Sequence, residues 1–371
     1  MNPMGTLMAD VRSVLHFSAV GLRDVPVVGG KGASLGELLR AGIRVPTGYA
    51  VTTAAFRQAV EHLTLEGRPI ADRVAALDPA DADRLAAETA RVRAVVESAP
   101  LPAEVAEAIA SAYAALCEEC GDPTQPVAVR SSATSEDSAE DSFAGLQDTY
   151  LWVRGGDSVV EHVRRCWASL YSVESVTYRR RRGIPETDLG MAVVVQRMVG
   201  ARSSGVMFTR SPVSGDKSVV AIDASWGLGS AVVSGDVTPD SFVISKVTRE
   251  ITRRTVATKT RWHRPDPAGY GVVETDVPAE LQDRPSVSED EIAELVAIAR
   301  RVEAHYGCPQ DIEWAVAESD GQVHLLQSRP ETVWAEKDAA KAAAPVAAPT
   351  ANAFDHVFNL LGPKRPSSSG S

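Results

Sequence analysis

The sequence lacks a long apolar run. A membrane-spanning helix needs about eighteen consecutive apolar residues, and the best candidate here, residues 191–195, is far shorter. The N-terminal residues include Asp10 and Arg12 and contain no uninterrupted hydrophobic region, so we expect no secretory signal. These absences predict a protein that does not enter a membrane.

Cysteine is also scarce. The four cysteines, Cys117, Cys120, Cys166 and Cys308, are few for 371 residues, which favours a reducing cytoplasm over a disulfide-stabilised fold. Cys117 and Cys120 form a C-x-x-C pair, but a zinc site would need a second pair of ligands at similar spacing, and none follows. The alternative is that both cysteines simply share one face of a helix.

An excess of basic residues is missing as well. The chain carries 38 Lys and Arg against 49 Asp and Glu, which gives a formal charge of −11. This balance argues against general binding to nucleic acid or to an anionic membrane, since both require a basic surface. It leaves room for one small polyanion in a locally basic cleft. The length allows two domains.

The first third of the chain is expected to be mostly helical, and it contains no repeat of fixed period. Residues 25–28 indicate a short strand that leads into a glycine-rich segment and a helix ending near Gly42. Residues 53–120 have apolar residues three and four apart, which is typical of helices. Prolines are expected to interrupt this stretch at Pro79, Pro100 and Pro102.

The rest of the chain changes to short β-branched runs separated by Gly, Ser and Pro. Residues 158–182 indicate a helix whose final arginines, 179–182, are either a solvated helix end or a docking site for a partner. Ser288 and Glu291 predict a capping box for a helix that stops at Gly307. The expected strands are residues 127–129, 192–195, 205–209, 219–223 and 242–245.

After Trp334 the sequence becomes rich in Ala, Pro and Lys, which is typical of a linker. An apolar island follows at residues 354–361, and it either docks a partner or belongs to an unstructured tail. We therefore expect the folded unit to end near residue 334.

A glycine-rich segment, residues 29–36, contains Lys31. Glycines let the backbone approach an anion closely, the following helix N-terminus contributes partial positive charge, and Lys31 adds a full charge. The segment is not a P-loop, because Gly32 follows the lysine in place of Ser or Thr, and Val25 replaces the first glycine. An ordinary strand–turn–helix corner is the alternative.

Arg130 stands at the end of an expected strand, before a loop rich in small and hydroxyl side chains. A guanidinium, Ser and Thr hydroxyls and exposed backbone N–H groups together suit phosphate oxygens. Arg130 is therefore a candidate phosphate-binding residue. The alternative is a surface salt bridge beside a flexible loop.

A hairpin is expected around Asp320, in Ser-Asp-Gly. Glu313 and Gln327 are equally far from Asp320, so a symmetric hairpin sets them opposite each other, with Arg329 on the same face. A carboxylate and an amide oxygen side by side are ligands suited to Mg²⁺. The alternative is a polar cross-strand pair on a solvated face.

Together these segments resemble the nucleotide-binding domain of the phosphoenolpyruvate synthase and pyruvate phosphate dikinase family. That family includes rifampicin phosphotransferases and the ATP-binding subunit of phenylphosphate synthase. The resemblance covers about residues 15–334 in order. It is carried by GGKGASLGE (29–37), VPTG (45–48), VRSSATSED (129–137), SFAG (142–145), VQRMV (195–199), SGVMFT (204–209), WGLG (226–229), DIEW (311–314) and LQSRPET (326–332).

The resemblance implies an α+β fold, an ATP-grasp-like domain whose two lobes close on ATP. We divide the chain accordingly into an N-terminal lobe at 1–190, a C-terminal lobe at 191–334, and a linker and tail at 335–371.

The resemblance also implies roles for individual residues. The phosphate-contacting and catalytic candidates are Lys31, Arg130 and Arg329. The magnesium ligands would be Glu313 and Gln327. Gln196, Arg197 and Met198 match the segment that holds adenine, largely through backbone groups, and Gly145 lies in the loop that covers the phosphates.

Two departures from the family pattern stand out. Ser230 follows Trp-Gly-Leu-Gly where the family usually has Glu, which puts any ribose or metal contact of that Glu in doubt. The family's histidine-bearing segment and its phosphoenolpyruvate- or pyruvate-binding barrel are both missing, and none of the seven histidines lies in a matching context. His324, nearest the metal pair in sequence, is expected to point to the opposite face of its strand.

Family members cleave ATP to AMP and phosphate and move the β-phosphoryl group onto a histidine of a mobile domain. The resemblance therefore implies a cytoplasmic, ATP- and Mg²⁺-dependent phosphotransferase subunit whose histidine lies on a separate partner protein. That partner would hold a small-molecule acceptor, a phenol in the case of phenylphosphate synthase. The alternatives are an N-terminal piece of a phosphoenolpyruvate synthase or rifampicin phosphotransferase, and a non-catalytic nucleotide-sensing module.

Overall fold

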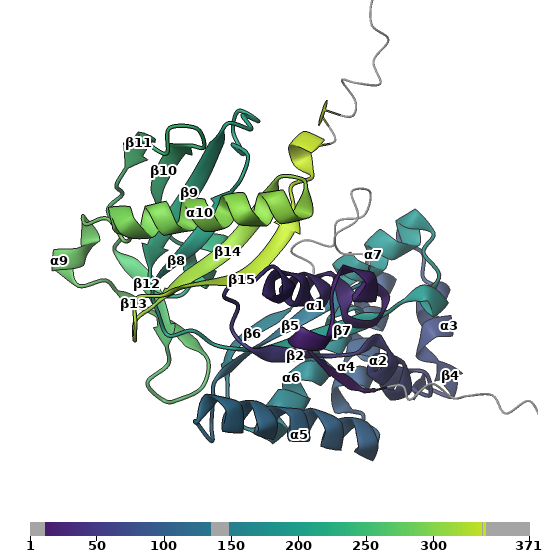
Figure 1. Cartoon of the computed structure of the whole chain (residues 1–371). Coiled ribbons are helices and arrows are strands. Elements are labelled where there is room, and N and C mark those ends of the chain that lie inside the picture. Colours follow the sequence, from purple (N-terminus) through teal and green to yellow (C-terminus); the bar gives the residue numbers. More distant parts are fainter. Residues whose placement is uncertain (1–11, 135–147, 336, 339–371) are drawn as a thin grey trace, which may run out of the picture. The chain divides into compact units, whose positions relative to one another are not determined.

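The computed structural model describes residues 12–134, 148–335 and 337–338. One compact unit ends at Glu331, and a second begins at Thr332. The first unit contains two antiparallel sheets with helices packed on them, which is the α+β fold that the sequence predicts (Figure 1). Among the described residues, no helix combines the length and apolar character needed to cross a membrane.

The first sheet has five strands in the order β1-β2-β7-β5-β6. Its central strand β7 is almost wholly apolar and is buried along its length, because both faces of the sheet are covered. The bounds are β1 Val14–His16, β2 Gly48–Val51, β5 Val127–Ala133, β6 Thr149–Val153 and β7 Met191–Arg197.

Helices flank this first sheet, as expected for residues 53–120 and 158–182. They are α2 Thr53–Val60, α3 Ile70–Ala75, α4 Ala82–Ser98, α5 Ala103–Cys120, α6 Gly156–Ser169 and α7 Val173–Arg182. A small hairpin, β3 Thr64–Leu65 and β4 Arg68–Pro69, follows α2, and three short 3₁₀ turns occupy Phe17–Ala19, Leu22–Asp24 and Glu186–Asp188. Cys117 and Cys120 both lie on α5, and no group of three metal-ligating side chains occurs in the described part of the chain.

The second sheet has six strands in the order β11-β10-β9-β8-β14-β15. The bounds are β8 Ala201–Phe208, β9 Val219–Trp226, β10 Asp240–Ser245, β11 Ile251–Thr255, β14 Gln310–Ala317 and β15 Val323–Pro330. The long helix α10, Glu289–Tyr306, crosses one face of this sheet (Figure 1). It begins at the predicted capping box and stops at Gly307.

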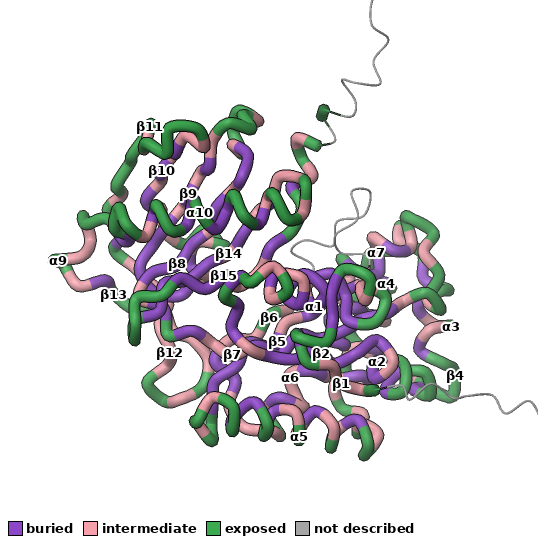
Figure 2. Tube along the Cα trace, viewed as in Figure 1, coloured by how far each residue is buried: buried purple, intermediate pink, exposed green. Residues whose placement is uncertain are grey.

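Shorter elements complete the second half. A separate hairpin pairs β12 Arg261–Pro265 with β13 Val272–Asp276, and two short helices are α8 Ser230–Val233 and α9 Ala279–Gln282. Figure 2 shows that buried residues concentrate along the strands, whereas the edge strand β11 is mostly exposed.

Residues 25–28 form a helix, so the expected strand at this position is wrong. Helix α1, Val25–Arg40, starts there with Pro26 in its first turn, where the missing N–H is not needed. Gly29 interrupts the helix with φ 68° and ψ 174°, and a regular helix follows. Lys31 therefore lies in the first helical turn after this kink.

The arginines at the end of α7 differ in their environments. Arg179 is buried and donates to Glu186 and to the carbonyl of Leu170, so it is neither solvated nor available for docking. Arg180 donates to the carbonyl of Leu77. Arg179 and Arg180 therefore help to hold the end of α7 in place, whereas Arg181 and Arg182 are exposed, as in a solvated helix end.

The division of the chain into lobes at residue 190 remains a proposal. By hydrogen bonding, β7 belongs to the first sheet, since it pairs with β2 and β5. The chain passes from the first sheet to the second between Arg197 and Ala201.

Candidate nucleotide site

An ion pair joins the two sheets at the centre of the site. Arg130 on β5 donates through Nη2 to Oε2 of Glu313 on β14, at 2.7 Å. Burial alone raises the pKa of the Glu313 carboxyl, but the charges of Arg130, Lys31 and Arg329 bring that pKa below its ordinary value. Glu313 is therefore ionised at neutral pH.

Gln327 on β15 pairs directly with Glu313 on β14, which confirms the predicted register. The amide oxygen Oε1 of Gln327 is buried and has no hydrogen-bond partner among the described residues. A buried acceptor without a donor is unfavourable, and a cation beside it would remove that cost. One carboxylate oxygen and one amide oxygen fit a Mg²⁺ ion that keeps its other positions for water and phosphate.

The other cationic candidates lie close to Glu313. Lys31 comes from the helical turn after Gly29, and Arg329 comes from the end of β15. Both lower the pKa of Glu313, which places their charges near its carboxylate. Gly145 lies outside the described residues. The roles of all these residues in phosphate binding stay predictions.

A cavity of about 320 Å³ opens beside the ion pair and is lined from both sheets. Arg130 and Glu313 form its charged end. Small and apolar side chains line much of the rest, including Ala128, Leu151, Ala201, Gly205, Leu228, Ala315 and Leu326. An apolar pocket with a few placed polar groups is typical of a small-molecule site.

The expected adenine segment also lines this cavity, through Gln196, Arg197 and Met198. The Gln196 side chain donates to the carbonyl of Pro46. The backbone N–H groups of Arg197 and Met198 donate to carbonyls within the fold, at 2.9 Å each. Val199, which the sequence reasoning left out, also lines the cavity, and its N–H has no acceptor among the described residues. The role of residues 196–198 in holding adenine stays a prediction.

Asp311 is a second residue near the site that sequence reasoning missed. It lies two residues before Glu313 on β14, and its Oδ2 is 3.5 Å from Nε of Arg329. Burial raises the pKa of Asp311 to about 6, against the opposing effect of Arg329. The alternation of Asp311 and Glu313 on one strand was the available signal, since residues two apart share a face.

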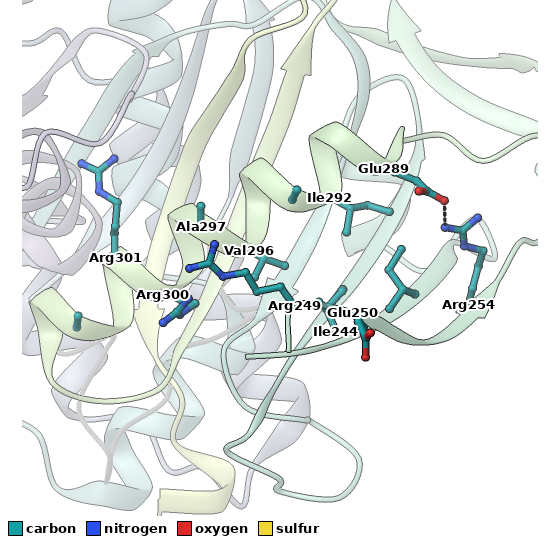
Figure 3. Close-up of a pocket in the computed structure, with 13 residues that line it drawn as sticks. Ile244, Arg249, Glu250, Arg254, Glu289, Ile292, Val296, Ala297, Arg300 and Arg301 are labelled. Atoms are coloured by element: carbon teal, nitrogen blue, oxygen red, sulfur yellow. Dashed lines mark hydrogen bonds and ion pairs between the residues drawn. The ribbon is translucent and has the colours of Figure 1, made fainter. Parts of the chain in front are cut away.

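A larger groove of about 800 Å³ lies on the other side of the second sheet, between α10 and β11 (Figure 3). Ile244 and Val296 lie on its floor, Arg249 and Arg300 lie along it, and Arg254 pairs with Glu289 at one end. It contains none of the predicted site residues.

The fold and this geometry agree with what the chain is similar to. The family model described as "Pyruvate phosphate dikinase, AMP/ATP-binding domain" matches residues 25–348. A rifampicin phosphotransferase from Streptomyces is 46% identical over 329 residues, which are 88% of this chain and 36% of that protein. The phosphoenolpyruvate synthase of Pyrococcus furiosus is 38% identical over 368 residues, covering 90% of this chain and 45% of that protein.

A probable phosphoenolpyruvate synthase from Methanocaldococcus jannaschii is 41% identical over 310 residues, which are 84% of this chain and 26% of that protein. The chain thus spans between about a quarter and a half of the length of these relatives. The fold is ATP-grasp-like, as in that family. The chain belongs to the pyruvate phosphate dikinase AMP/ATP-binding domain family, the N-terminal nucleotide-binding domain of phosphoenolpyruvate synthases and their relatives.

Proposed function

We propose that the chain binds ATP with Mg²⁺ and transfers the β-phosphoryl group to a histidine on a separate protein. ATP is cleaved to AMP and phosphate, with water accepting the γ-phosphoryl group. The partner then passes the phosphoryl group to a small-molecule acceptor, a phenol being favoured. The observation that supports this most is the pairing of Arg130 with Glu313 at one end of a cavity. Gln327, whose side-chain oxygen has no hydrogen-bond partner among the described residues, pairs with Glu313 on the neighbouring strand.

The residues of this chain would act mainly by alignment and charge neutralisation, which is what phosphoryl transfer requires of a protein. Lys31, Arg130 and Arg329 supply three positive charges around Glu313. A bound Mg²⁺ would supply further positive charge to the phosphates. In the structure Arg130 pairs with Glu313. When nucleotide and Mg²⁺ bind, Arg130 would also have to contact the phosphates, and Glu313 would also have to contact the metal.

The proposal is tested by incubating the chain with Mg²⁺ and ATP labelled in the β-phosphoryl group, with and without a candidate phosphohistidine-domain protein. We expect AMP and acid-labile label on the partner, and no turnover without the partner. A Glu313→Ala variant should lose transfer, whereas Glu318→Ala, which changes an exposed glutamate just after β14, should retain it. Nucleotide binding without transfer to any such partner would favour a sensing module.

The chain matches only part of each relative's length, and this supports a second candidate function. Because the matched region is only 26–45% of the three proteins named above, the chain could act as the N-terminal nucleotide-binding part of a longer synthase or antibiotic phosphotransferase. The mass of the single polypeptide, as it occurs in the cell, distinguishes the separate subunit from the longer enzyme. A mass near 39.4 kDa supports the separate subunit, and a mass more than twice as large supports the longer enzyme.

A further inference from the structure

The groove between α10 and β11, which we call the α10 groove, lies on the face of the second sheet away from the nucleotide cavity. Ile312 of β14 packs in the same apolar core as Val296 of α10, which lines the groove. Glu313, the next residue of β14, lines the nucleotide cavity, and successive residues of a strand point to opposite faces. An occupant of the α10 groove would therefore leave the nucleotide cavity open.

The α10 groove exists because one helix is narrower than a six-stranded sheet. Neighbouring strands are about 4.8 Å apart, so the sheet is about 24 Å wide, whereas a helix is about 10 Å across. Helix α10 contacts β14 and β15. All residues that line the groove belong to α10, β10, β11 or the turn before β11. The open width beside α10 is therefore about that of one more helix.

The floor of the α10 groove is apolar and its helical wall is made of small side chains. Ile244 of β10 and Val296 of α10 are buried beneath it. Ala293, Ala297 and Ala304 of α10 line it and are exposed. Because the distance between packed helices depends on the side chains at their contact, alanines let a second helix approach closely. The groove thus suits the apolar face of an amphipathic helix.

The charges around the α10 groove are mostly positive, although the whole chain has a formal charge of −11. Four arginines and two glutamates line it. Arg254 pairs with Glu289, and Arg301 donates to the carbonyls of Ala41 and Gly42. These two arginines already have partners within the fold.

The other two arginines, Arg249 and Arg300, are exposed and make no side-chain hydrogen bond or ion pair with any residue that the structure describes. Arg249 extends from the turn before β11 toward α10 (Figure 3). Guanidinium groups bind carboxylates through charge-assisted hydrogen bonds. The complement of this groove is therefore a helix with an apolar face and acidic side chains beside it.

We propose that the α10 groove docks an acidic amphipathic helix of a partner protein. The apolar face of that helix covers the open part of the sheet beside α10, and its carboxylates pair with Arg249 and Arg300. This inference goes beyond the proposed function, because the groove and the nucleotide cavity lie on opposite faces of the sheet.

The test measures binding of labelled helical peptides to the full chain by fluorescence anisotropy, without nucleotide. The acidic probe is a peptide of about 15 residues, or four turns, with leucines along one face and glutamates on both flanks of that face. The basic probe has lysines in place of the glutamates. We expect the acidic probe to bind the wild-type chain at least about ten-fold more tightly than the basic probe.

Variants locate the binding in the groove. Arg249→Glu combined with Arg300→Glu should reverse the preference, so that the basic probe binds more tightly. Arg57→Glu combined with Arg84→Glu, which reverses two exposed arginines of α2 and α4, should preserve the wild-type preference. Ala297→Trp places a large side chain in the groove from an exposed position and should weaken both probes.

Three results would overturn the inference. The first is that the wild-type chain binds neither probe, or binds both equally. The second is that the preference survives reversal of Arg249 and Arg300. The third is that sedimentation shows a dimer of the wild-type chain that Ala297→Trp dissociates, since the groove would then hold a second copy of this chain. Because the assay contains no nucleotide, its result does not depend on the proposed function.

Discussion

Gly29 sets the position of Lys31 through its backbone conformation. Its φ of 68° breaks helix α1 and lies in the region that favours glycine. Ser132 of β5 bridges the kink, because its Oγ donates to the carbonyl of Val28 at 2.9 Å and accepts from the N–H of Gly32 at 3.3 Å. The helical turn that contains Lys31 is therefore held against β5, the strand that also contains Arg130.

We expect Gly29→Ala to destabilise the protein and to weaken ATP binding. A Cβ at this position would lie 2.0 Å from the Ser132 carbonyl oxygen, in addition to the backbone strain of a positive φ. The free energy of unfolding in urea should fall by about 3 kcal/mol. Gly121→Ala is the control, since Gly121 has φ 69° with no atom within 4 Å, and it should cost only about 1 kcal/mol. Equal losses for the two variants would contradict the steric account.

The metal assignment is tested at Gln327. Gln327→Leu removes the unpartnered oxygen, so we expect the Mg²⁺ concentration needed for half-maximal ATP binding to rise by at least about ten-fold. Protein stability should change little or increase, because a buried polar group without a partner is lost. Gln322→Leu, at an exposed position of the same hairpin, should leave the Mg²⁺ requirement unchanged. An unchanged requirement in Gln327→Leu would exclude this residue as a ligand.

At the scale of elements, helix α10 depends on its first turn. Ser288 accepts from the N–H of Glu291 at 3.2 Å, and Glu291 accepts from the N–H of Ser288 at 2.8 Å. Arg202 of β8 also donates to Glu291. Burial alone would raise the pKa of Glu291, but the bonds from Ser288 and Arg202 hold it below its ordinary value. The cap therefore ties α10 to the sheet that it covers.

This lowered pKa predicts a pH dependence. A carboxyl with a lower pKa in the folded state stabilises the protein above its unfolded pKa of about 4.3, and the contribution is lost as the pH falls through the folded-state pKa. Glu291→Ala should lower the free energy of unfolding by about 1 kcal/mol at pH 7, with the difference from wild type shrinking below about pH 4.

The matched control for this element is Glu289→Ala. Glu289 lies in the same first turn, is 76% exposed and pairs with Arg254 at the surface. Such a pair contributes about 0.5 kcal/mol or less. Urea titrations at a series of pH values check both variants. A Glu291→Ala difference that stays constant down to pH 3 would contradict the role of the ionised carboxyl.

Patterns among residues close in sequence predicted some elements correctly and failed to predict others. The capping box and the hairpin register of Glu313 with Gln327 follow from residues close in sequence, and both are confirmed. Residues 25–28 have β-branched side chains, but Pro26 suits a first helical turn equally well, and tertiary packing decided for the helix. Hairpin β12–β13 was missed because its residues are half-exposed and show no clear alternation.

At the scale of the whole molecule, the site exists only because two sheets meet. Arg130 and Glu313 are 183 residues apart, and no periodicity in the sequence sets their distance of 2.7 Å. The same is true of Ser230 and His263, which depend on the approach of a separate hairpin. The candidate site residues follow from the resemblance, whereas the pairing of Arg130 with Glu313 could be found only in the fold.

This construction predicts that nucleotide binding stabilises both sheets together. A ligand at one hundred times its dissociation constant adds about 2.7 kcal/mol to the free energy of unfolding. For a unit of this size we expect MgATP to raise the midpoint of thermal unfolding by about 4 °C. Because the cavity is lined by β5 and β7 of the first sheet and by β8 and β14 of the second, calorimetry should show one transition that moves as a whole. Arg130→Met should remove most of the shift. Two separate transitions, of which only one responds to MgATP, would show that the nucleotide is held by one sheet alone.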